Sequence, residues 1–399
     1  MTPLAEIAEA AGTPVYVYDA DLFRTRIARL REALAGVPHQ ICYAAKANDA
    51  LALLRIAAET GLGADIVSGG ELAKALRAGV PADRIVFSGV GKRPDEIRAA
   101  LEAGVRSLNV ESLPELEVVA GEARALALAA PVSVRLNPDV DPRTHRYVAT
   151  GTATSKFGLG PEAALEALER AAGEQALQPV GISFHVGSQL PDQAPILAAA
   201  ERAAELWRAA KEGGIALHDL DVGGGLPVAY DGGVEPDVKG YARALGSVAA
   251  GLEAELVLEP GRWLVGPVGT LLTRVLYVKE AGGRAVAVCD AGMNDLIRPA
   301  LYGAEHPIQV LDAGGRERAE VDVVGPVCES GDFFALGREL PSPTAGDLLA
   351  IGLVGAYGRV MASTYNARPL CAEVLVEDGS WRITREHGTA DDLVRGEVI

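Results

Sequence analysis

The segment YAAKAN, residues 43–48, places a lysine directly after an apolar run. A lysine that is screened from water in such a position has a lowered pKa, and its free amine suits Schiff-base chemistry. The competing interpretation is a lysine whose ammonium reaches solvent along an apolar stem. Lys46 is therefore a candidate covalent residue, and the other motifs decide between the two interpretations.

Three later motifs also follow apolar runs: FHVGSQ (184–189), DVGGG (221–225) and EPGR (259–262). His185 could stack on a cofactor ring or could be an ordinary core histidine. Gly224 and Gly225 expose backbone N–H groups that can wrap a phosphate, although plain tight turns use the same residues. Glu259 could keep a pyridine nitrogen protonated and Arg262 could bind a carboxylate, or the two could form a surface ion pair.

The last third of the chain adds three polar segments: MNDLIRPALY (293–302), CESGD (328–332) and GAYG (355–358). Cys328 stands next to Glu329, and a thiol beside a carboxylate could donate a proton. The alternative is a small buried cysteine. The other two segments contribute Arg298, Tyr302 and Tyr357. Each motif alone is a weak signal, whereas their joint order along one chain is specific.

The elements that must position these residues alternate between strands and helices in the first two-thirds of the chain. Apolar runs predict strands at Ile41–Ala45, Ala64–Ser68, Ile85–Ser88, Ser107–Val110, Val132–Leu136, Val180–Phe184, Leu217–Asp221 and Glu255–Leu258. Amphipathic stretches between them predict helices, for example at Gly70–Ala78, Pro94–Ala103, Pro161–Ala172 and Ile196–Lys211. Eight strands separated by helices favour an α/β fold with a (β/α)8 TIM barrel, in which catalytic groups follow the strands. A doubly wound open sheet is the alternative.

The pattern changes after about Gly266, where β-like segments separated by glycine and proline turns predict a mostly β C-terminal domain. These segments are Gly269–Val278, Ala285–Cys289, Glu320–Val324, Leu348–Leu353 and Ala372–Val376. We expect a barrel over residues 25–265 and the β-rich domain over 266–399. The strand-like Val15–Tyr18 makes the N-terminal segment 1–24 a candidate addition to the β-rich domain.

Composition narrows the class of protein. Hydrophobic residues make up 49% of the 399 residues, which is enough for a large core. A formal net charge of -17 repels phosphate backbones, so we expect no nucleic-acid partner. The four scattered cysteines have neither disulfide-framework nor zinc-site spacing, which predicts no metal and a cytoplasmic location. The N-terminal sequence is not typical of a signal peptide, and no apolar segment has membrane-spanning length.

Taken together, the motifs resemble those of the fold-type III, or alanine-racemase-like, pyridoxal-phosphate decarboxylases. Within them, the sequence is similar to the diaminopimelate decarboxylases in FHVGSQ, EPGR, DAGMNDLIRPALYGA, VGPVCESGDFF and YNARP. The resemblance runs from TPVYVYD near the start to the AEVLV strand. Thr364 differs from the Asn that many relatives carry, and the segment between His145 and Ser155 also departs from common forms.

The resemblance implies decarboxylation of meso-2,6-diaminopimelate to L-lysine and CO2, the last step of lysine biosynthesis, with pyridoxal 5'-phosphate as cofactor. It implies that Lys46 binds the cofactor through a Schiff base, that His185 stacks on the ring and that Glu259 pairs with the ring nitrogen. It places Ser188, Gly224, Gly225, Gly261 and Tyr357 around the phosphate and makes Arg262 a further cofactor-binding residue. Arg262, Arg298 and Tyr302 would bind the distal carboxylate of the substrate, with Glu329 on its distal amine and Tyr357 as a further substrate-binding residue. Cys328 would reprotonate the reacting carbon, and Cys328 and Glu329 would reach the other subunit of a homodimer.

Two other functions remain open from the sequence. One is a sister decarboxylase of a basic or polyamine-related amino acid, such as ornithine or arginine. Two guanidiniums, Arg262 and Arg298, argue against a substrate whose distal end is cationic. The other is a non-catalytic relative that binds a partner. Such proteins usually lose the cofactor lysine or the phosphate loop, and both are present here.

Overall fold

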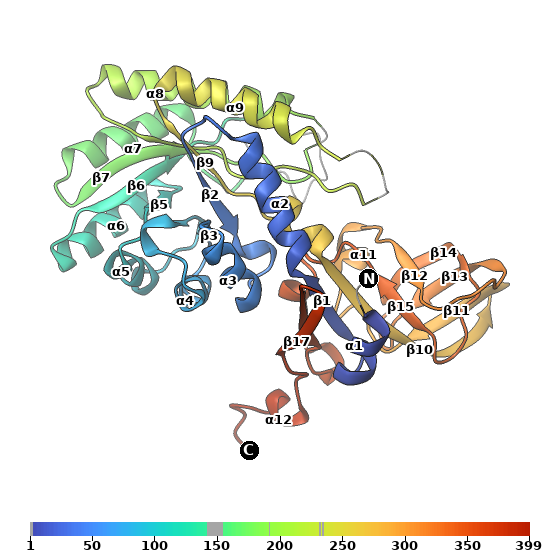
Figure 1. Ribbon diagram of the computed structural model, residues 1–399. Helices are drawn as coiled ribbons and strands as arrows, with labels where there is room; N and C mark the ends of the chain where they lie inside the picture. Colours follow the sequence, from blue (N-terminus) through green and yellow to red (C-terminus); the bar gives the residue numbers. More distant parts are fainter. Residues whose placement is uncertain (1–2, 142–154, 191, 231–232, 234) are drawn as a thin grey trace. The chain divides into compact units, whose positions relative to one another are not determined.

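The structure is a computed structural model that describes residues 3–141, 155–190, 192–230, 233 and 235–399. The described residues divide into two compact units (Figure 1). The first unit is formed by Met1–Thr25, Val228–Val234 and Leu264–Ile399, and it is called the β unit below. The second, formed by Arg26–Pro227 and Glu235–Trp263, is called the barrel unit. The segment between His145 and Ser155, which differs from the common forms of the family, lies mostly outside the described residues.

Within the described residues of the barrel unit, eight parallel strands close into a barrel. They are β2 (His39–Ala44), β3 (Gly63–Ile66), β4 (Ile85–Phe87), β5 (Ser107–Val110), β6 (Ala130–Arg135), β7 (Leu177–Ser183), β8 (Asp219–Asp221) and β9 (Glu255–Leu258). Closure comes from β2, which pairs with β3 on one side and with β9 on the other. The predicted (β/α)8 barrel is therefore confirmed, and the doubly wound sheet is excluded.

Helices cover the outside of the barrel strands, as Figure 1 shows. In chain order the helices of this part are α2 (Ala20–Ala33), α3 (Leu51–Glu59), α4 (Gly69–Ala78), α5 (Pro94–Ala103), α6 (Leu113–Leu126), α7 (Pro161–Gly173), α8 (Ala194–Glu212), α9 (Val238–Leu252) and α10 (Arg262–Val265). Helix α5 begins at Pro94, whose fixed φ suits a first helical position, and ends before Gly104, whose φ of 76° few other residues adopt. Local residue chemistry thus sets both ends of this helix.

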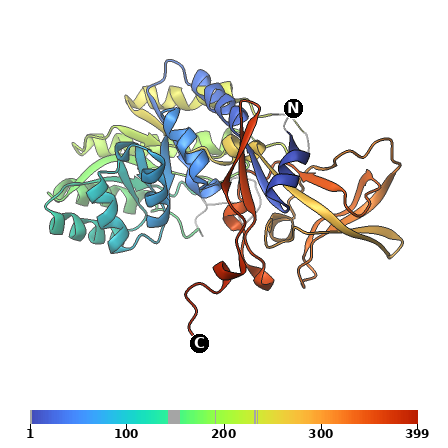
Figure 2. The same ribbon diagram turned by 60° about the horizontal axis from the view of Figure 1, so that its bottom comes forward.

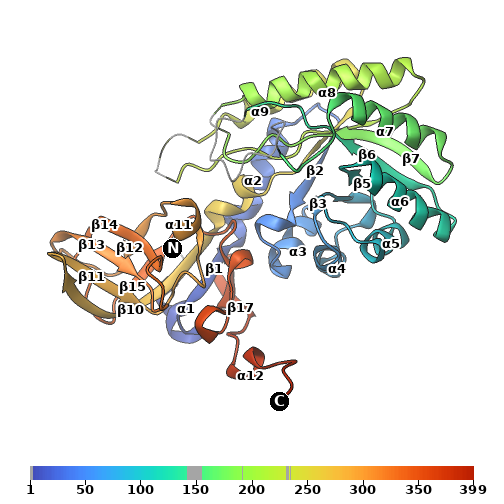
Figure 3. The same ribbon diagram turned by 180° about the vertical axis from the view of Figure 1, so that it is seen from behind.

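The β unit is built around a long twisted sheet (Figure 3). Its strands are β1 (Val15–Asp19), β10 (Gly269–Ala281), β11 (Arg284–Cys289), β12 (Ile308–Val310), β13 (Arg318–Val324), β14 (Phe333–Pro341), β15 (Leu348–Ile351), β16 (Ala372–Glu377) and β17 (Ser380–Arg385). Its helices are α1 (Leu4–Ala11), α11 (Arg298–Tyr302) and α12 (Ala390–Leu393). The main strand order is β14-β13-β11-β10-β1-β16-β17, with β15 and β12 attached through β10.

The N-terminal strand β1 is an interior strand of this sheet. It pairs antiparallel with β10 and parallel with β16, which continues into the hairpin β16–β17, the red pair of strands in Figure 2. Apolar side chains of β1 and its neighbours pack with helix α1 into one core; these are Ile7, Ala8, Val15, Val17, Leu272, Leu348, Ala350, Ala372, Val374 and Val376. Burial of the apolar face of α1 therefore stabilises the packing of this helix against the sheet.

Some predicted boundaries are wrong by a few residues. Strand β15 ends at Ile351 rather than at Leu353, because Leu353 takes a φ of 57° and leaves the sheet. Strand β8 begins at Asp219, two residues later than predicted. No sequence pattern predicted that the described part of Val228–Val234 belongs to the β unit. No helix in the described residues has the length and apolar character needed to span a membrane.

Candidate active site

The expected site residues fall into two groups, one in each unit. In the barrel unit, Lys46 lies in the short turn Ala45–Ala47 that directly follows β2. Its Nζ atom lies 2.5 Å from Oδ2 of Asp65, a fully buried residue of β3. Among the described residues, Oδ1 of Asp65 has no hydrogen-bond partner. A buried carboxylate thus holds the amine at the C-terminal end of the strand, where barrel enzymes place reactive groups.

Glu259 follows β9 and is part of a buried polar network. The hydroxyl of Ser88 donates to Oε1 of Glu259 over 3.2 Å. Asn109 donates its side-chain N–H groups to Ser88 Oγ over 3.0 Å and to Asp221 Oδ2 over 3.2 Å. Asn109 therefore links the hydrogen bonds of the two carboxyl groups, and both are nearly excluded from water.

The electrostatics of this network favour a cation beside it. Burial raises the pKa of Glu259 well above its usual range, and the carboxyl groups of Asp221 and Asp65 raise it further, while Lys46 opposes them. Burial also raises the pKa of Asp221, to about 6. Ionising these carboxyls without a nearby positive charge is costly, so a bound cation would be stabilised here.

The glycine-rich loop after β8 has no room for side chains. A Cβ atom on Gly224 would lie 2.7 Å from the carbonyl oxygen of Glu259. Gly225 has a φ of 124°, and a Cβ atom there would lie 2.8 Å from Leu190 Cδ1. Both positions therefore require glycine for steric reasons, and the bare backbone offers N–H groups to an anion.

His185 lies against this loop and is neutral. The backbone N–H of Gly224 donates to its Nδ1 atom over 3.2 Å, so Nδ1 is an acceptor. Burial lowers the pKa of His185 well below its usual range, and the positive charges of Lys46 and Arg135 lower it further. A neutral imidazole can lie on a positively charged ring without repelling it.

Gly261 and Arg262 follow Glu259 in sequence. A Cβ atom on Gly261 would lie 2.8 Å from the methyl carbon of Ala47, next to Lys46, so this position also requires glycine. Arg262 is nearly buried, and its Nε donates to Ser188 Oγ over 3.0 Å. This hydrogen bond joins Ser188, which is expected at the phosphate, to Arg262, which is expected to bind both cofactor and substrate.

These residues fit pyridoxal phosphate. The cofactor presents an aldehyde, a basic ring nitrogen and a phosphate. The barrel unit offers an amine at Lys46, the buried carboxyl of Glu259, whose raised pKa calls for a cation, and loops that need glycine at Gly224, Gly225 and Gly261. Each chemical part of the cofactor therefore has a matching group in the barrel unit.

In the β unit, Arg298 begins helix α11 and is 5% exposed. Its Nη1 donates to the Tyr230 hydroxyl over 2.9 Å, and its guanidinium lies 4.8 Å from the centre of the Tyr230 ring. Nη1 also lies 3.4 Å from Nε2 of His306, whose Nδ1 contacts the carbonyl oxygen of Gly352 at 3.0 Å. Tyr230 and His306 thus fix the direction of the guanidinium. Tyr302 ends the same helix and is half-buried.

Cys328 and Glu329 lie in the loop between β13 and β14, and both are exposed in the single chain. The backbone N–H of Cys328 donates to Oδ1 of Asn366 over 2.8 Å. Tyr357 lies in the loop after β15 with a φ of 57°, a left-handed conformation that is rare for a large residue.

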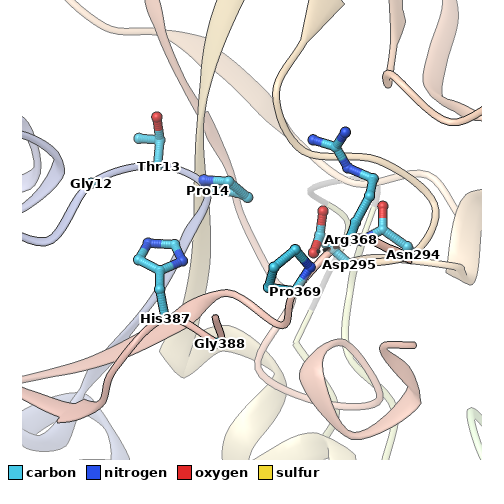
Figure 4. Close-up of a pocket in the computed structure, with 9 residues that line it drawn as sticks. All are labelled: Gly12, Thr13, Pro14, Asn294, Asp295, Arg368, Pro369, His387 and Gly388. Atoms are coloured by element: carbon cyan, nitrogen blue, oxygen red, sulfur yellow. Dashed lines mark hydrogen bonds between the residues drawn. The ribbon is translucent and has the colours of Figure 1, made fainter. Parts of the chain in front are cut away.

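A separate pocket of about 350 Å³ lies within the β unit (Figure 4). It is lined by Gly12, Thr13, Pro14, Asn294, Asp295, Arg368, Pro369, His387 and Gly388. None of the expected site residues lines it. Burial raises the pKa of Asp295 in its wall to about 6.

Sequence reasoning missed several members of these networks. Asp221 stood inside the DVGGG motif, so its position at a strand end was a usable signal. Asp65 lies within a predicted strand, where a carboxylate in an apolar run was also a usable signal, whereas Asn109, Tyr230 and His306 carry no motif of their own. Their roles come from long-range contacts, such as the one that joins Asn109 to a residue 112 positions later.

A closed (β/α)8 barrel with a lysine after its first strand, a buried glutamate after its last and a glycine-rich loop between them is the arrangement of a pyridoxal-dependent decarboxylase. The family described as "Pyridoxal-dependent decarboxylase, pyridoxal binding domain" matches residues 20–266. Over 99% of its length the chain is 44% identical to the diaminopimelate decarboxylase of Zymomonas mobilis, of which it covers 95%. The chain belongs to the diaminopimelate decarboxylase family.

Two further comparisons agree. The diaminopimelate decarboxylase of Pseudomonas aeruginosa is 45% identical over 99% of this chain and 95% of that protein. The crystal structure of the Helicobacter pylori diaminopimelate decarboxylase complexed with L-lysine superposes with a TM-score of 0.95 at 42% identity, covering 98% of both chains. The resemblance seen in the motifs is therefore confirmed, and pyridoxal phosphate is the cofactor of this family.

Proposed function

We propose that this protein decarboxylates meso-2,6-diaminopimelate to L-lysine and CO2 with pyridoxal phosphate. The observation that carries the proposal is the barrel site, formed by Lys46 beside buried Asp65, the buried Glu259 and the glycine-rich loop, in a chain that is 44% identical to a diaminopimelate decarboxylase over 99% of its length. When bound, the cofactor would supply an electron-withdrawing ring that could take up the electron pair left as CO2 departs.

The barrel residues hold and tune this group. Lys46 would attach it covalently, and its neighbour Asp65 holds the amine in place. Glu259 would keep the ring nitrogen protonated, because a carboxylate buried beside other carboxyls strongly favours a cationic neighbour. His185, neutral and hydrogen-bonded to the Gly224 N–H, would pack against the ring. Ser188, Gly224, Gly225, Gly261 and Tyr357 would bind the phosphate.

The remaining residues read the substrate. Arg262, Arg298 and Tyr302 bind the distal carboxylate, and Arg298 is ready for this because Tyr230 fixes its guanidinium. Glu329 binds the distal ammonium. The Sγ atom of Cys328 gives its proton to the carbon from which CO2 has left.

We further propose that the active unit is a cytoplasmic homodimer with shared sites. Cys328 and Glu329 are exposed in the single chain, which a residue that serves a neighbouring subunit must be before assembly. The cysteines Cys42, Cys289, Cys328 and Cys371 are all free thiols, as expected in a reducing compartment.

The test is an assay of purified protein for CO2 release from meso-diaminopimelate, ornithine, lysine and arginine, with the visible absorbance of the bound cofactor recorded in parallel. We expect turnover of diaminopimelate at least about a hundredfold above the others, because a substrate without a distal carboxylate leaves buried guanidiniums without their partner. Equal turnover of ornithine would move the protein to the polyamine branch. A colourless, inactive protein would indicate a non-catalytic relative.

A further inference from the structure

Two side chains, those of Asp332 and Asn366, accept hydrogen bonds from the backbone of the loop that carries Cys328. The backbone N–H of Val327 donates to Oδ2 of Asp332 over 2.5 Å. The next N–H, that of Cys328, donates to Oδ1 of Asn366 over 2.8 Å. Two consecutive amides are thus fixed by hydrogen bonds while the thiol itself is exposed. The backbone is held, and only the side chain is left to meet a ligand.

Asn366 is presented by a strained turn. Its φ and ψ are 55° and 30°, and Ala367, the next residue, has a φ of 52°. Asparagine tolerates this left-handed region, whereas alanine adopts it only at a cost that other contacts must offset. Strain that persists in an exposed loop indicates that the loop is shaped for a task, and here the strained Ala367 directly follows the residue that accepts the hydrogen bond from Cys328.

The strained turn is anchored on both sides to one segment, Asp290–Asp295. On one side the backbone N–H of Ser363 donates to the carbonyl oxygen of Asn294 over 2.8 Å. On the other side Nη2 of Arg368 donates to the carbonyl oxygen of Asp290 over 2.9 Å. Figure 4 shows Arg368 beside Asn294 and Asp295.

The same segment also anchors the Cys328 loop. Oδ1 of Asp332 accepts the backbone N–H of Met293 over 2.6 Å, while its Oδ2 accepts that of Val327. Asp332 is 5% exposed, so these hydrogen bonds are shielded from water. The loop of Cys328 and the turn of Asn366 are therefore both hydrogen-bonded to the segment Asp290–Asp295, which couples their positions.

We propose that Asn366 is a positioning residue for Cys328, with Asp332 as the second anchor of the same loop. The proposal rests on the proposed function, in which the Cys328 thiol protonates the reacting carbon. A cysteine side chain has one torsion between its backbone and Sγ, so the backbone at residue 328 restricts the sulfur to three staggered positions. Asn366 thus sets where the proton is delivered without touching substrate or cofactor.

The experiment compares three variants of the holoenzyme. Asn366→Gly removes the acceptor and adds no strain, because glycine adopts a φ near 55° freely. Asn366→Asp keeps an oxygen acceptor in a residue that also tolerates this conformation. Thr364→Ala is the control, since Thr364 is exposed in the same loop and is not one of the two side chains proposed to position Cys328. The measurements are exchange of the Cys328 amide hydrogen, kcat and KM for diaminopimelate, and the solvent isotope effect on kcat.

For Asn366→Gly we expect amide exchange at Cys328 to rise about fivefold or more, as for loss of one hydrogen bond. We expect kcat to fall about ten- to a hundredfold, because a displacement of about 1 Å between reacting groups has effects of that size. KM should stay within about twofold, and the solvent isotope effect should grow as proton delivery becomes slower. Asn366→Asp should restore amide protection and most of kcat, and Thr364→Ala should resemble the wild type.

Faster exchange at Cys328 with unchanged kcat would overturn the proposal, because the hydrogen bond would then be structural only. An equal loss of kcat in Thr364→Ala, or an Asn366→Asp variant that recovers protection but not kcat, would also overturn it. Absence of diaminopimelate turnover by the wild-type protein is a different outcome, since it refutes the proposed function and with it this role of Asn366.

Discussion

Replacement of Arg298 by alanine should separate substrate recognition from cofactor binding. The guanidinium is nearly buried and is directed by the Tyr230 hydroxyl at 2.9 Å and by the Tyr230 ring at 4.8 Å. A bidentate contact from such a group supplies two charged hydrogen bonds, each worth about 1.5–3 kcal/mol. Their loss amounts to about 3–6 kcal/mol, so kcat/KM for diaminopimelate should fall by about two to four orders of magnitude.

The assay is steady-state CO2 release together with the visible spectrum of the holoenzyme. The spectrum should be unchanged, because Arg298 is not among the residues expected to bind the cofactor. Tyr230→Phe is the matched control: it keeps the ring under the guanidinium and removes one hydrogen bond, so about a five- to tenfold loss is expected. A loss of less than tenfold in Arg298→Ala, or an equal loss of cofactor absorbance, would refute the assignment.

The other predictions concern the barrel site and its assembly. Lys46→Ala should abolish the borohydride-stable label from pyridoxal phosphate, and peptide mapping that finds the label on another lysine would contradict the assignment. Glu259→Gln should retain cofactor but decarboxylate far more slowly, and near-normal kcat would exclude its role at the ring nitrogen. Burial raises the pKa of Asp221 to about 6, so the folded, cofactor-free protein is most stable below about pH 3.8, where this carboxyl is protonated, and loses stability as pH rises through 6. The Asp221→Asn variant cannot ionise there, so its free energy of unfolding should rise by about 3 kcal/mol relative to that of the wild type between pH 3.8 and 6. A difference in unfolding free energy that does not change with pH would exclude the pKa shift. Mixing Lys46→Ala with Cys328→Ala should restore part of the activity if two chains share a site, and no rescue after verified subunit exchange would favour a site within one chain.

The barrel could be predicted from the sequence because its signals are local. Helix α5 was placed at both ends, since Pro94 and Gly104 each act through their own backbone chemistry. The barrel strands appeared as apolar runs because parallel strands are buried on both faces. Strand ends then located Lys46 and Glu259, since residues that follow barrel strands share one end of the barrel.

The networks that tune the site could not be predicted in the same way. The contact between Asn109 and Asp221 joins two strands far apart in sequence, and no local pattern marks either as a partner of the other. The hydrogen bond from Cys328 to Asn366 depends on the left-handed conformation of Asn366. The sequence YNARP does not by itself dictate that conformation. Such contacts arise from packing across the whole chain, which local propensity does not encode.

Strand β1 has a consequence for how the protein is made. It leaves the ribosome before its partners β10 and β16, which begin at Gly269 and Ala372, so it stays unpaired until each of them has been synthesised. The barrel residues emerge during that wait and can fold as a unit while synthesis continues. The sheet around β1 closes only when β16 arrives, since its pairings span almost the whole chain and such distant pairings form slowly. The residues of the β unit, Cys328 and Arg298 included, are thus the last to reach their native places.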